Sequence, residues 1–371
     1  MSCPDPDRLA ALLCDWCIEA RRSDQVLVAF TLQSLELLRA LHRALLERGA
    51  WPLLRLHPSQ LAEDFYRFAR EPQLDAVAPL ELAEARGADA LIAILAPANT
   101  RALAGVDPAL VARHARATAP LLEARSRPDL RWCGTIWPTP ALAQQAGMGE
   151  RDYAAFVRRA LLLDRPDPLA AWRELSARQA RLVARLSTAR EVRIEAEGTD
   201  LRLRVEGRAW INSDGKRNMP SGEVFTGPHE DSAQGTIRFT IPSSARGVEV
   251  AGVQLRFERG VVVEARAERG EEHLRAALAT DAGARRLGEL GIGTNPGIDR
   301  ATGSTLLDEK IAGTVHLALG RSYPETGGRN SSALHWDLIC DLRAGGRLLI
   351  DDEPLSLEAA GLDAPTSVEV K

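Results

Sequence analysis

The feature that most constrains the fold is a change in hydrophobic period near Ser187. Before this residue, helical spacing of apolar side chains alternates with short apolar runs, a pattern typical of helices packed on buried parallel strands. After it, apolar and charged residues alternate, which is typical of half-buried antiparallel strands. A chain of 371 residues is also too long for one core. We therefore expect an α/β N-terminal domain with a mostly parallel sheet (1–187), followed by an α+β domain rich in antiparallel strands (188–371).

The same periodicities predict individual elements. In the first domain we expect strands near 26–30, 53–56, 90–95 and 130–136, and helices near 34–47, 108–123, 152–163 and 168–186. In the second domain we expect hairpins near 192–205 and 248–267, and a helix near 271–287 that leads into a glycine-rich loop.

Composition and charge narrow the class of protein. Hydrophobic residues make up 45% and charged residues 26%, and the net charge of -4 comes without a long basic run, which argues against a nucleic-acid partner. No apolar stretch is long enough to cross a membrane, and the N-terminus is polar and acidic, so we expect a cytoplasmic protein. The chain has five cysteines, which are Cys3, Cys14, Cys17, Cys133 and Cys340. Because they lack the spacing of a disulfide framework, they also favour a reducing compartment.

Two short motifs resemble functional sites, but the sequence argues against both. Cys14 and Cys17 form a CxxC within a helical apolar pattern, so we expect them to pack on a helix face and not to bind zinc. The glycines of the segment 288–293 do not follow the GxGxxG order and do not open a helix after a strand. The sequence therefore argues against a dinucleotide site.

Residues suited to metal binding gather in the second domain. Strand residues two apart point to the same face, so His335 and Asp337 are expected to lie side by side, and His316 has a small neighbour on its own strand face. Glu223 stands at a strand start and Glu289 in the glycine-rich loop, both among apolar neighbours. Poorly solvated carboxylates need a cation or hydrogen bonds to stay ionised. Each residue alone also suits a structural role, but together they indicate a metal centre.

Four strings in this region carry a resemblance to a known family: NMPSGEVFTGPHEDS, LGELGIGTN, DEKIAGTVHLALGRSYPETGG and ALHWDL. They resemble the M29 metallopeptidases, the aminopeptidase T and aminopeptidase S group, densely over 218–341 and more weakly through the N-terminal domain. The resemblance implies a metal-dependent aminopeptidase that releases N-terminal amino acids from short peptides. It also implies a homodimer with enclosed active sites, a tyrosine near the metals, which would be Tyr323, and the metal ligands Glu223, Glu289, His316, His335 and Asp337.

This ligand set suits two divalent ions. Three carboxylates would offset three of the four positive charges, and two neutral imidazoles would add nitrogen ligands. Two such ions can activate a shared water and polarise a scissile carbonyl. Nitrogen and oxygen ligands without thiolate suit zinc, cobalt and manganese alike. We expect Glu289 to bridge the two metals and Tyr323 to donate a hydrogen bond to the oxyanion.

Glu309 and Lys310 are the remaining candidates for chemistry, because they lie just before the His316 strand in the sequence. We expect Glu309 to act as the general base or as a further metal ligand. The alternative is an ordinary surface salt bridge with Lys310. His229, in a turn after the Glu223 strand, is expected to be structural because it lacks the second histidine of an HExxH motif.

Two other functions stay open at this point. A dinuclear metal amidase acting on another small amide would need the same metals. An inactive binding protein on the same fold would be expected to lack at least one ligand, and all five are present.

Overall fold

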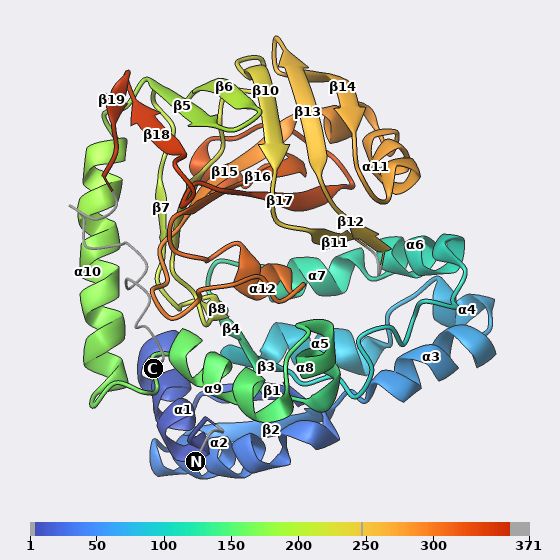
Figure 1. The fold of residues 1–371 in the computed structure, drawn as a ribbon. Helices are drawn as coiled ribbons and strands as arrows, with labels where there is room; N and C mark the ends of the chain where they lie inside the picture. Colours follow the sequence, from blue (N-terminus) through green and yellow to red (C-terminus); the bar gives the residue numbers. More distant parts are fainter. Residues whose placement is uncertain (1–3, 246–247, 357–371) are drawn as a thin grey trace. The chain divides into compact units, whose positions relative to one another are not determined.

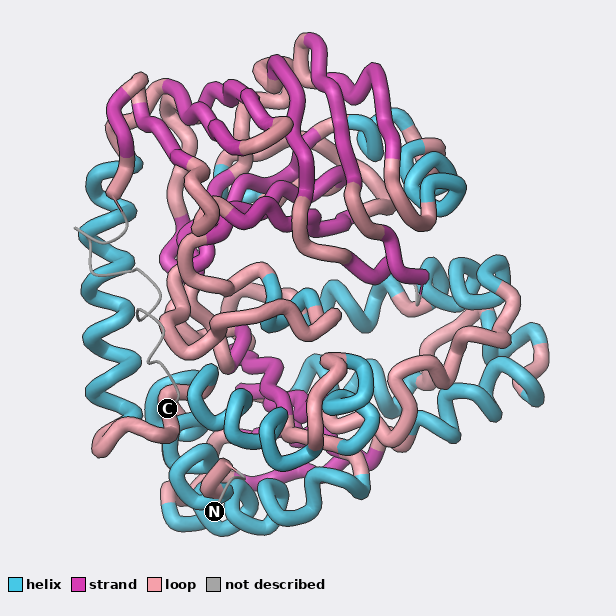
Figure 2. Tube along the Cα trace, in the orientation of Figure 1, coloured by secondary structure: helices cyan, strands magenta, loops and turns pink. Residues whose placement is uncertain are grey.

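The computed structural model describes residues 4–245 and 248–356, so Cys3 lies outside the described residues. By the contacts between its residues the chain forms two compact units. The first comprises Met1–Ala171 with Gly215–Pro220, and the second Trp172–Asp214 with Ser221–Lys371. The domain boundary predicted after Ser187 stays a prediction. Figure 1 labels the elements of both units, and Figure 2 distinguishes the helix-rich first unit from the strand-rich second one.

The first unit contains a fully parallel sheet of order β2-β1-β3-β4-β8, which confirms the predicted α/β class. The predicted strands all form, and one short strand from later in the chain joins the edge. The bounds are β1 Gln25–Phe30, β2 Trp51–Leu56, β3 Ala90–Leu95, β4 Arg131–Ile136 and β8 Asn218–Met219. Two residues are too few for a periodicity signal, which explains why β8 was not predicted.

Helices flank these strands (Figure 2). Their bounds are α1 Pro6–Leu12, a π-helical turn Leu13–Cys17, α2 Leu35–Glu47, α3 Ser59–Phe68, α4 Glu71–Leu74, α5 Pro79–Gly87, α6 Pro108–Ala117, α7 Ala119–Arg125, α8 Pro140–Gln145 and α9 Glu150–Ala160. The helix α10 Pro168–Leu186 begins at the end of the first unit and belongs mostly to the second. The single helix predicted over 108–123 is two helices. Pro120 lies in the first turn of α7 and cannot continue α6, because its ring would clash with the carbonyl four residues earlier. Cys14 and Cys17 are buried, as expected for packing residues.

The second unit contains two larger antiparallel sheets, which confirms the predicted strand-rich class. One has the order β14-β13-β10-β6-β5-β18-β19 and the other the order β17-β16-β15-β9-β7. The strands are β5 Glu191–Ala196, β6 Thr199–Arg204, β7 Ile211–Ser213, β9 Glu223–Thr226, β10 Gln234–Phe239, β13 Val253–Glu258, β14 Val261–Arg266, β15 Leu287–Gly293, β16 Thr314–Gly320, β17 His335–Asp341, β18 Arg347–Ile350 and β19 Glu353–Pro354. A separate pair joins β11 Ser243–Ala245 to β12 Val248–Val250.

The segment around Glu289 differs from the prediction. The helix expected to reach residue 287 ends earlier, as α11 Glu271–Leu278, and a short 3₁₀ turn follows at Ala282–Arg285. Glu289 therefore lies in the middle of β15, a buried strand, and not in a loop. The glycines that suggested a loop are needed for close packing, because a Cβ atom at Gly288 would lie 2.3 Å from the carbonyl oxygen of Arg321.

Among the described residues, every helix is too short or too polar to cross a membrane. The four cysteines within the described ranges are free thiols in the interior: Cys14, Cys17, Cys133 and Cys340.

Candidate metal centre

The five-stranded sheet of the second unit brings all five predicted metal ligands together on one face. Glu289 on β15 and Asp337 on β17 both pair with Ala318 on β16, so the two carboxylates project on either side of a small side chain. His316 and His335 each stand two residues before one of these positions and share their face. The side-by-side placement predicted for His335 and Asp337 agrees with this register.

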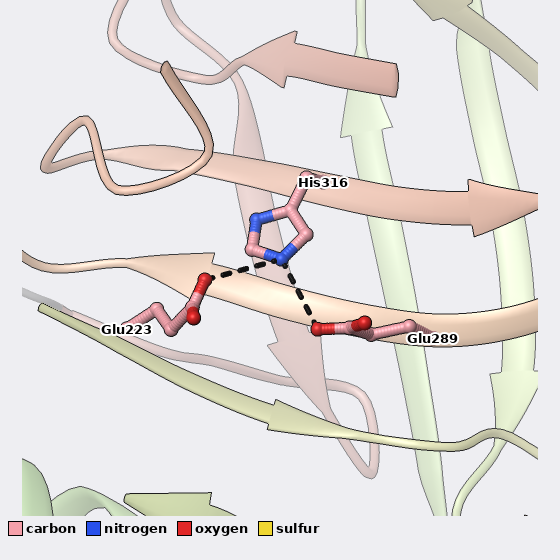
Figure 3. A group of neighbouring side chains, drawn as sticks. All are labelled: Glu223, Glu289 and His316. Atoms are coloured by element: carbon pink, nitrogen blue, oxygen red, sulfur yellow. Dashed lines mark ion pairs between the residues drawn. The ribbon is translucent and has the colours of Figure 1, made fainter. Parts of the chain in front are cut away.

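One group of three residues comes from three neighbouring strands. His316 Nε2 lies 3.5 Å from Glu223 Oε2 and 3.5 Å from Glu289 Oε1. Figure 3 draws both contacts as dashed lines. The three residues each offer one ligand atom, and these atoms all lie within 4.8 Å of one another. All three side chains are buried.

A second group shares one member with the first. His335 Nε2 lies 3.5 Å from Glu289 Oε2 and 3.6 Å from Asp337 Oδ2, and these ligand atoms too lie within 4.8 Å of one another. Glu289 thus presents Oε1 to the first group and Oε2 to the second. A carboxylate placed in this way has the orientation needed to bridge two cations.

The buried polar atoms of these groups fit cation binding. Both ring nitrogens of His316, Glu223 Oε2 and Asp337 Oδ1 are buried and have no hydrogen-bond partner among the described residues. Buried polar groups are almost always satisfied by a protein group, a water or an ion. His335 Nδ1 lies 2.9 Å from the carbonyl oxygen of Arg321, so its N–H donates there and Nε2 keeps its lone pair for a ligand.

The pKa values of these residues reflect their burial and their proximity to one another. Burial raises the pKa of Glu223 and of Glu289, and burial together with the nearby Glu309 charge raises the pKa of Asp337 to about 6. Burial alone would lower the pKa of His316, but the carboxylates of Glu289 and Glu223 outweigh it and raise the pKa to about 9. Without a cation, these four side chains retain protons that a cation would have to displace.

Gly291 makes room for His316 and was not predicted as part of the site. It pairs with His316 across the sheet, and a Cβ atom at this position would lie 2.0 Å from the imidazole Nε2. Any side chain here would therefore displace the histidine. The signal available in the sequence was a glycine two residues after Glu289, which shares its face once β15 is recognised as a strand.

Lys310 and Glu309 form a largely buried ion pair, which corrects the surface salt-bridge alternative. The Lys310 side chain is 0% exposed and its ammonium contacts Glu309 Oε1, while Nζ lies 3.4 Å from Glu223 Oε1. The Glu309 side chain is 14% exposed. The burial of Lys310 was not predicted, because a lysine in a charged tripeptide gives no sign of burial in the sequence.

Tyr323 lies at the edge of the second group. Its ring centroid is 5.1 Å from that of His335 and 5.6 Å from that of Phe225, with the rings nearly edge to face. Burial and the nearby carboxylates raise the pKa of Tyr323, so its hydroxyl stays protonated and can donate. His229 is separate from both groups, and its Nε2 lies 2.9 Å from the carbonyl oxygen of Glu206, which fits a structural role in its turn.

Asp308 supports the segment that carries Glu309 and Lys310, and sequence reasoning missed it. Its buried carboxylate accepts hydrogen bonds from the backbone N–H and hydroxyl of Thr302 and from the N–H of Gly303. These bonds tie the preceding turn to α12, Thr305–Asp308. The sequence offered only an acidic residue beside two other charges.

Comparison with known proteins places this site in a family. Residues 5–346 match the family described as thermophilic metalloprotease (M29). Aminopeptidase 2 of Geobacillus stearothermophilus is 37% identical over 283 residues, which span 69% of this chain and 67% of that protein. Aminopeptidase T of Thermus thermophilus is 32% identical over 350 residues, 86% of this chain and 85% of that protein.

Two solved structures resemble the fold. Wild-type AmpT from Thermus thermophilus has a TM-score of 0.81 at 28% identity, covering 95% of this chain and 97% of that one. A 2,5-dihydroxypyridine dioxygenase from Pseudomonas putida KT2440 has a TM-score of 0.56 at 15% identity, covering 99% and 98%, and shares the fold alone. The resemblance read from the four sequence strings is confirmed, and the chain belongs to the M29 family of thermophilic metalloproteases.

Proposed function

We propose that the protein is a dinuclear metal aminopeptidase that releases N-terminal amino acids from short peptides. The observation that carries the proposal is the position of Glu289, which presents one carboxylate oxygen to each of two ligand groups. Membership of a metalloprotease family supports the metals, and the relatives named aminopeptidases support the substrate class.

Two divalent ions would be held by the residues of the two groups. Glu223 and His316 would serve one ion and His335 and Asp337 the other, with Glu289 shared. Zinc, cobalt or manganese suits these oxygen and nitrogen ligands. When bound, such ions supply a nucleophilic water near neutral pH and polarise the scissile carbonyl.

The protein's own side chains would orient the substrate and move the proton. Tyr323, whose hydroxyl stays protonated, is placed beside His335 to donate a hydrogen bond to the developing oxyanion. The Glu309 side chain retains partial solvent access and its carboxylate contacts the Lys310 ammonium, which places it to accept a proton. The backbone carbonyl of Arg321 holds the His335 ring in its orientation.

A substrate panel tests the aminopeptidase proposal. Zinc-, cobalt- and manganese-loaded protein would be assayed against short peptides and aminoacyl amides, each with a free or an N-acetylated amine. We expect turnover of the free-amine series and at least about a hundredfold lower kcat/KM for the blocked series. Equal rates for both would favour the amidase alternative, and turnover of neither series would favour an inactive binding protein.

The affinity for zinc is expected to rise with pH. Asp337, with a pKa raised to about 6, must lose a proton before it can bind a metal, and His316, with a pKa of about 9, must do the same. Between pH 5 and 7 the apparent affinity should therefore increase at least about tenfold. Calorimetric zinc titrations in buffers of different ionisation enthalpy would measure both the affinity and the protons released. Affinity that is constant over this range would contradict the assignment.

The family resemblance also leads us to propose a homodimer, and the cysteine spacing, which favours a reducing compartment, leads us to propose a cytoplasmic location. A homodimer that encloses the active sites would restrict substrates to short peptides. Sedimentation equilibrium of the full chain at several concentrations would test the oligomeric state.

A further inference from the structure

We propose that Lys310 is a positioning residue that keeps Glu309 outside the metal-ligand set and thereby reserves its carboxylate for proton transfer. The inference rests on the proposed function, because it assigns a role within the same site. Lys310 belongs to neither ligand group and contacts two carboxylates, those of Glu309 and Glu223.

The first support is the placement of the ammonium. Lys310 is wholly buried, and its Nζ contacts Glu309 Oε1 and lies 3.4 Å from Glu223 Oε1. Its backbone is fixed as well, because its carbonyl accepts a hydrogen bond from Asn295 N at 3.0 Å and its N–H donates to the carbonyl oxygen of Leu307 at 3.1 Å. The charged end of the side chain is therefore anchored between the two carboxylates.

The second support is the division of the Glu223 carboxylate. Oε1 faces Lys310, whereas Oε2 faces His316 Nε2 at 3.5 Å and has no hydrogen-bond partner among the described residues. Lys310 thus occupies one oxygen and leaves the other for a cation. Neither ligand group found among the described residues includes Glu309, whose Oε1 contacts the same ammonium.

The third support is the charge of the site. Glu223, Glu289 and Asp337 would leave one positive charge in surplus on two divalent ions, and a fourth carboxylate would cancel it. The ammonium of Lys310 neutralises Glu309, so the surplus that polarises a substrate is kept. An isolated buried ammonium would be unstable, which means that the lysine and the glutamate act as a unit.

The sign of the expected effect follows from these charges. Replacing Lys310 by methionine keeps the length of the side chain but removes a cation and frees Glu309 to join the ligands. Metal affinity grows with the number of carboxylate charges at a site. We therefore expect Lys310→Met to bind zinc at least about tenfold more tightly, and to show a kcat reduced at least about a hundredfold at saturating zinc.

A charge-balanced double variant provides the matched comparison. Glu309→Gln with Lys310→Met removes the ion pair as a unit, so its zinc affinity is expected to stay within about threefold of the unmodified protein. Its kcat should be no lower than that of Glu309→Gln alone, because Lys310 acts through Glu309. Lys216→Met, which removes an exposed lysine paired with Glu19, is the control and should change neither quantity.

Zinc titration calorimetry and steady-state kinetics of these full-length variants decide between the outcomes. Unchanged or weaker zinc binding by Lys310→Met would overturn the proposal, and so would a tenfold loss of affinity in the double variant, which would make Glu309 a ligand. If Lys310→Met does not fold, a tenfold loss of zinc affinity in the charge-balanced double variant would still overturn the proposal. An unmodified protein that hydrolyses no free-amine peptide would refute the aminopeptidase assignment, while the zinc affinities would still test the role of Lys310.

Discussion

Replacing Glu289 by glutamine is expected to lower kcat at least about a thousandfold while the fold is retained. Glu289 presents Oε1 to His316 and Oε2 to His335, and an amide cannot offer two anionic oxygens to two cations. The substitution preserves the size of the side chain, so β15 should keep its pairing with β9 and β16. The measurement is kcat on a free-amine peptide at saturating concentration, with zinc content determined by elemental analysis on the same sample.

Glu272→Gln is the matched control for this experiment, because it makes the same chemical change on the exposed surface of α11. We expect it to retain both activity and metal. Should Glu289→Gln keep two zinc ions and more than about a tenth of the activity, Glu289 does not bridge them.

The second large effect is expected from Gly291→Ala, which adds one methyl group to a residue that offers no ligand atom itself. A Cβ atom there would lie 2.0 Å from His316 Nε2, and the two residues are held opposite each other by the pairing of β15 with β16. The imidazole must therefore rotate away from Glu223 and Glu289. We expect zinc affinity at the first group to fall about ten- to a hundredfold, with a comparable loss of kcat/KM.

Gly105→Ala serves as the control, since a Cβ atom at that glycine meets nothing within 4 Å. Overpacking at Gly291 is also expected to cost about 1–3 kcal/mol of stability, so the melting temperature is recorded alongside the zinc affinity. A loss of stability with unchanged zinc binding would show that His316 is not a ligand.

Much of the fold follows from periodicity in the sequence. The strands at 26–30 and 90–95 are apolar runs between helical segments, and they form the parallel core of the first sheet. The hairpin β5–β6 alternates apolar and charged residues and has the expected antiparallel pairing. Such segments are predictable because burial of one or both faces leaves a local pattern.

The errors in the fold prediction occur where tertiary contacts outweigh local pattern. Three glycines made β15 look like a loop, but they are required because neighbouring backbone and the His316 ring approach too closely for any side chain. The two-residue strand β8 pairs with β4, which lies far away in the sequence. No local window contains this information.

In the candidate site, too, local spacing could be predicted from the sequence and long-range contacts could not. His335 and Asp337 could be paired from their two-residue spacing, because a strand places such residues on one face. The burial of Lys310 between Glu223 and Glu309 could not be predicted, since it depends on residues more than eighty positions apart meeting in three dimensions. Their charges suggested a solvent-exposed pair, and only the fold shows that the pair is buried.

The most direct test of a two-metal centre is a zinc titration of chelator-treated protein, with initial rates of hydrolysis of a free-amine peptide followed at each addition. If Glu289 bridges two ions, the rate should remain low through the first equivalent and reach its plateau only as the second equivalent binds, with two zinc ions retained per chain by elemental analysis. A plateau reached at one equivalent would contradict the dinuclear assignment.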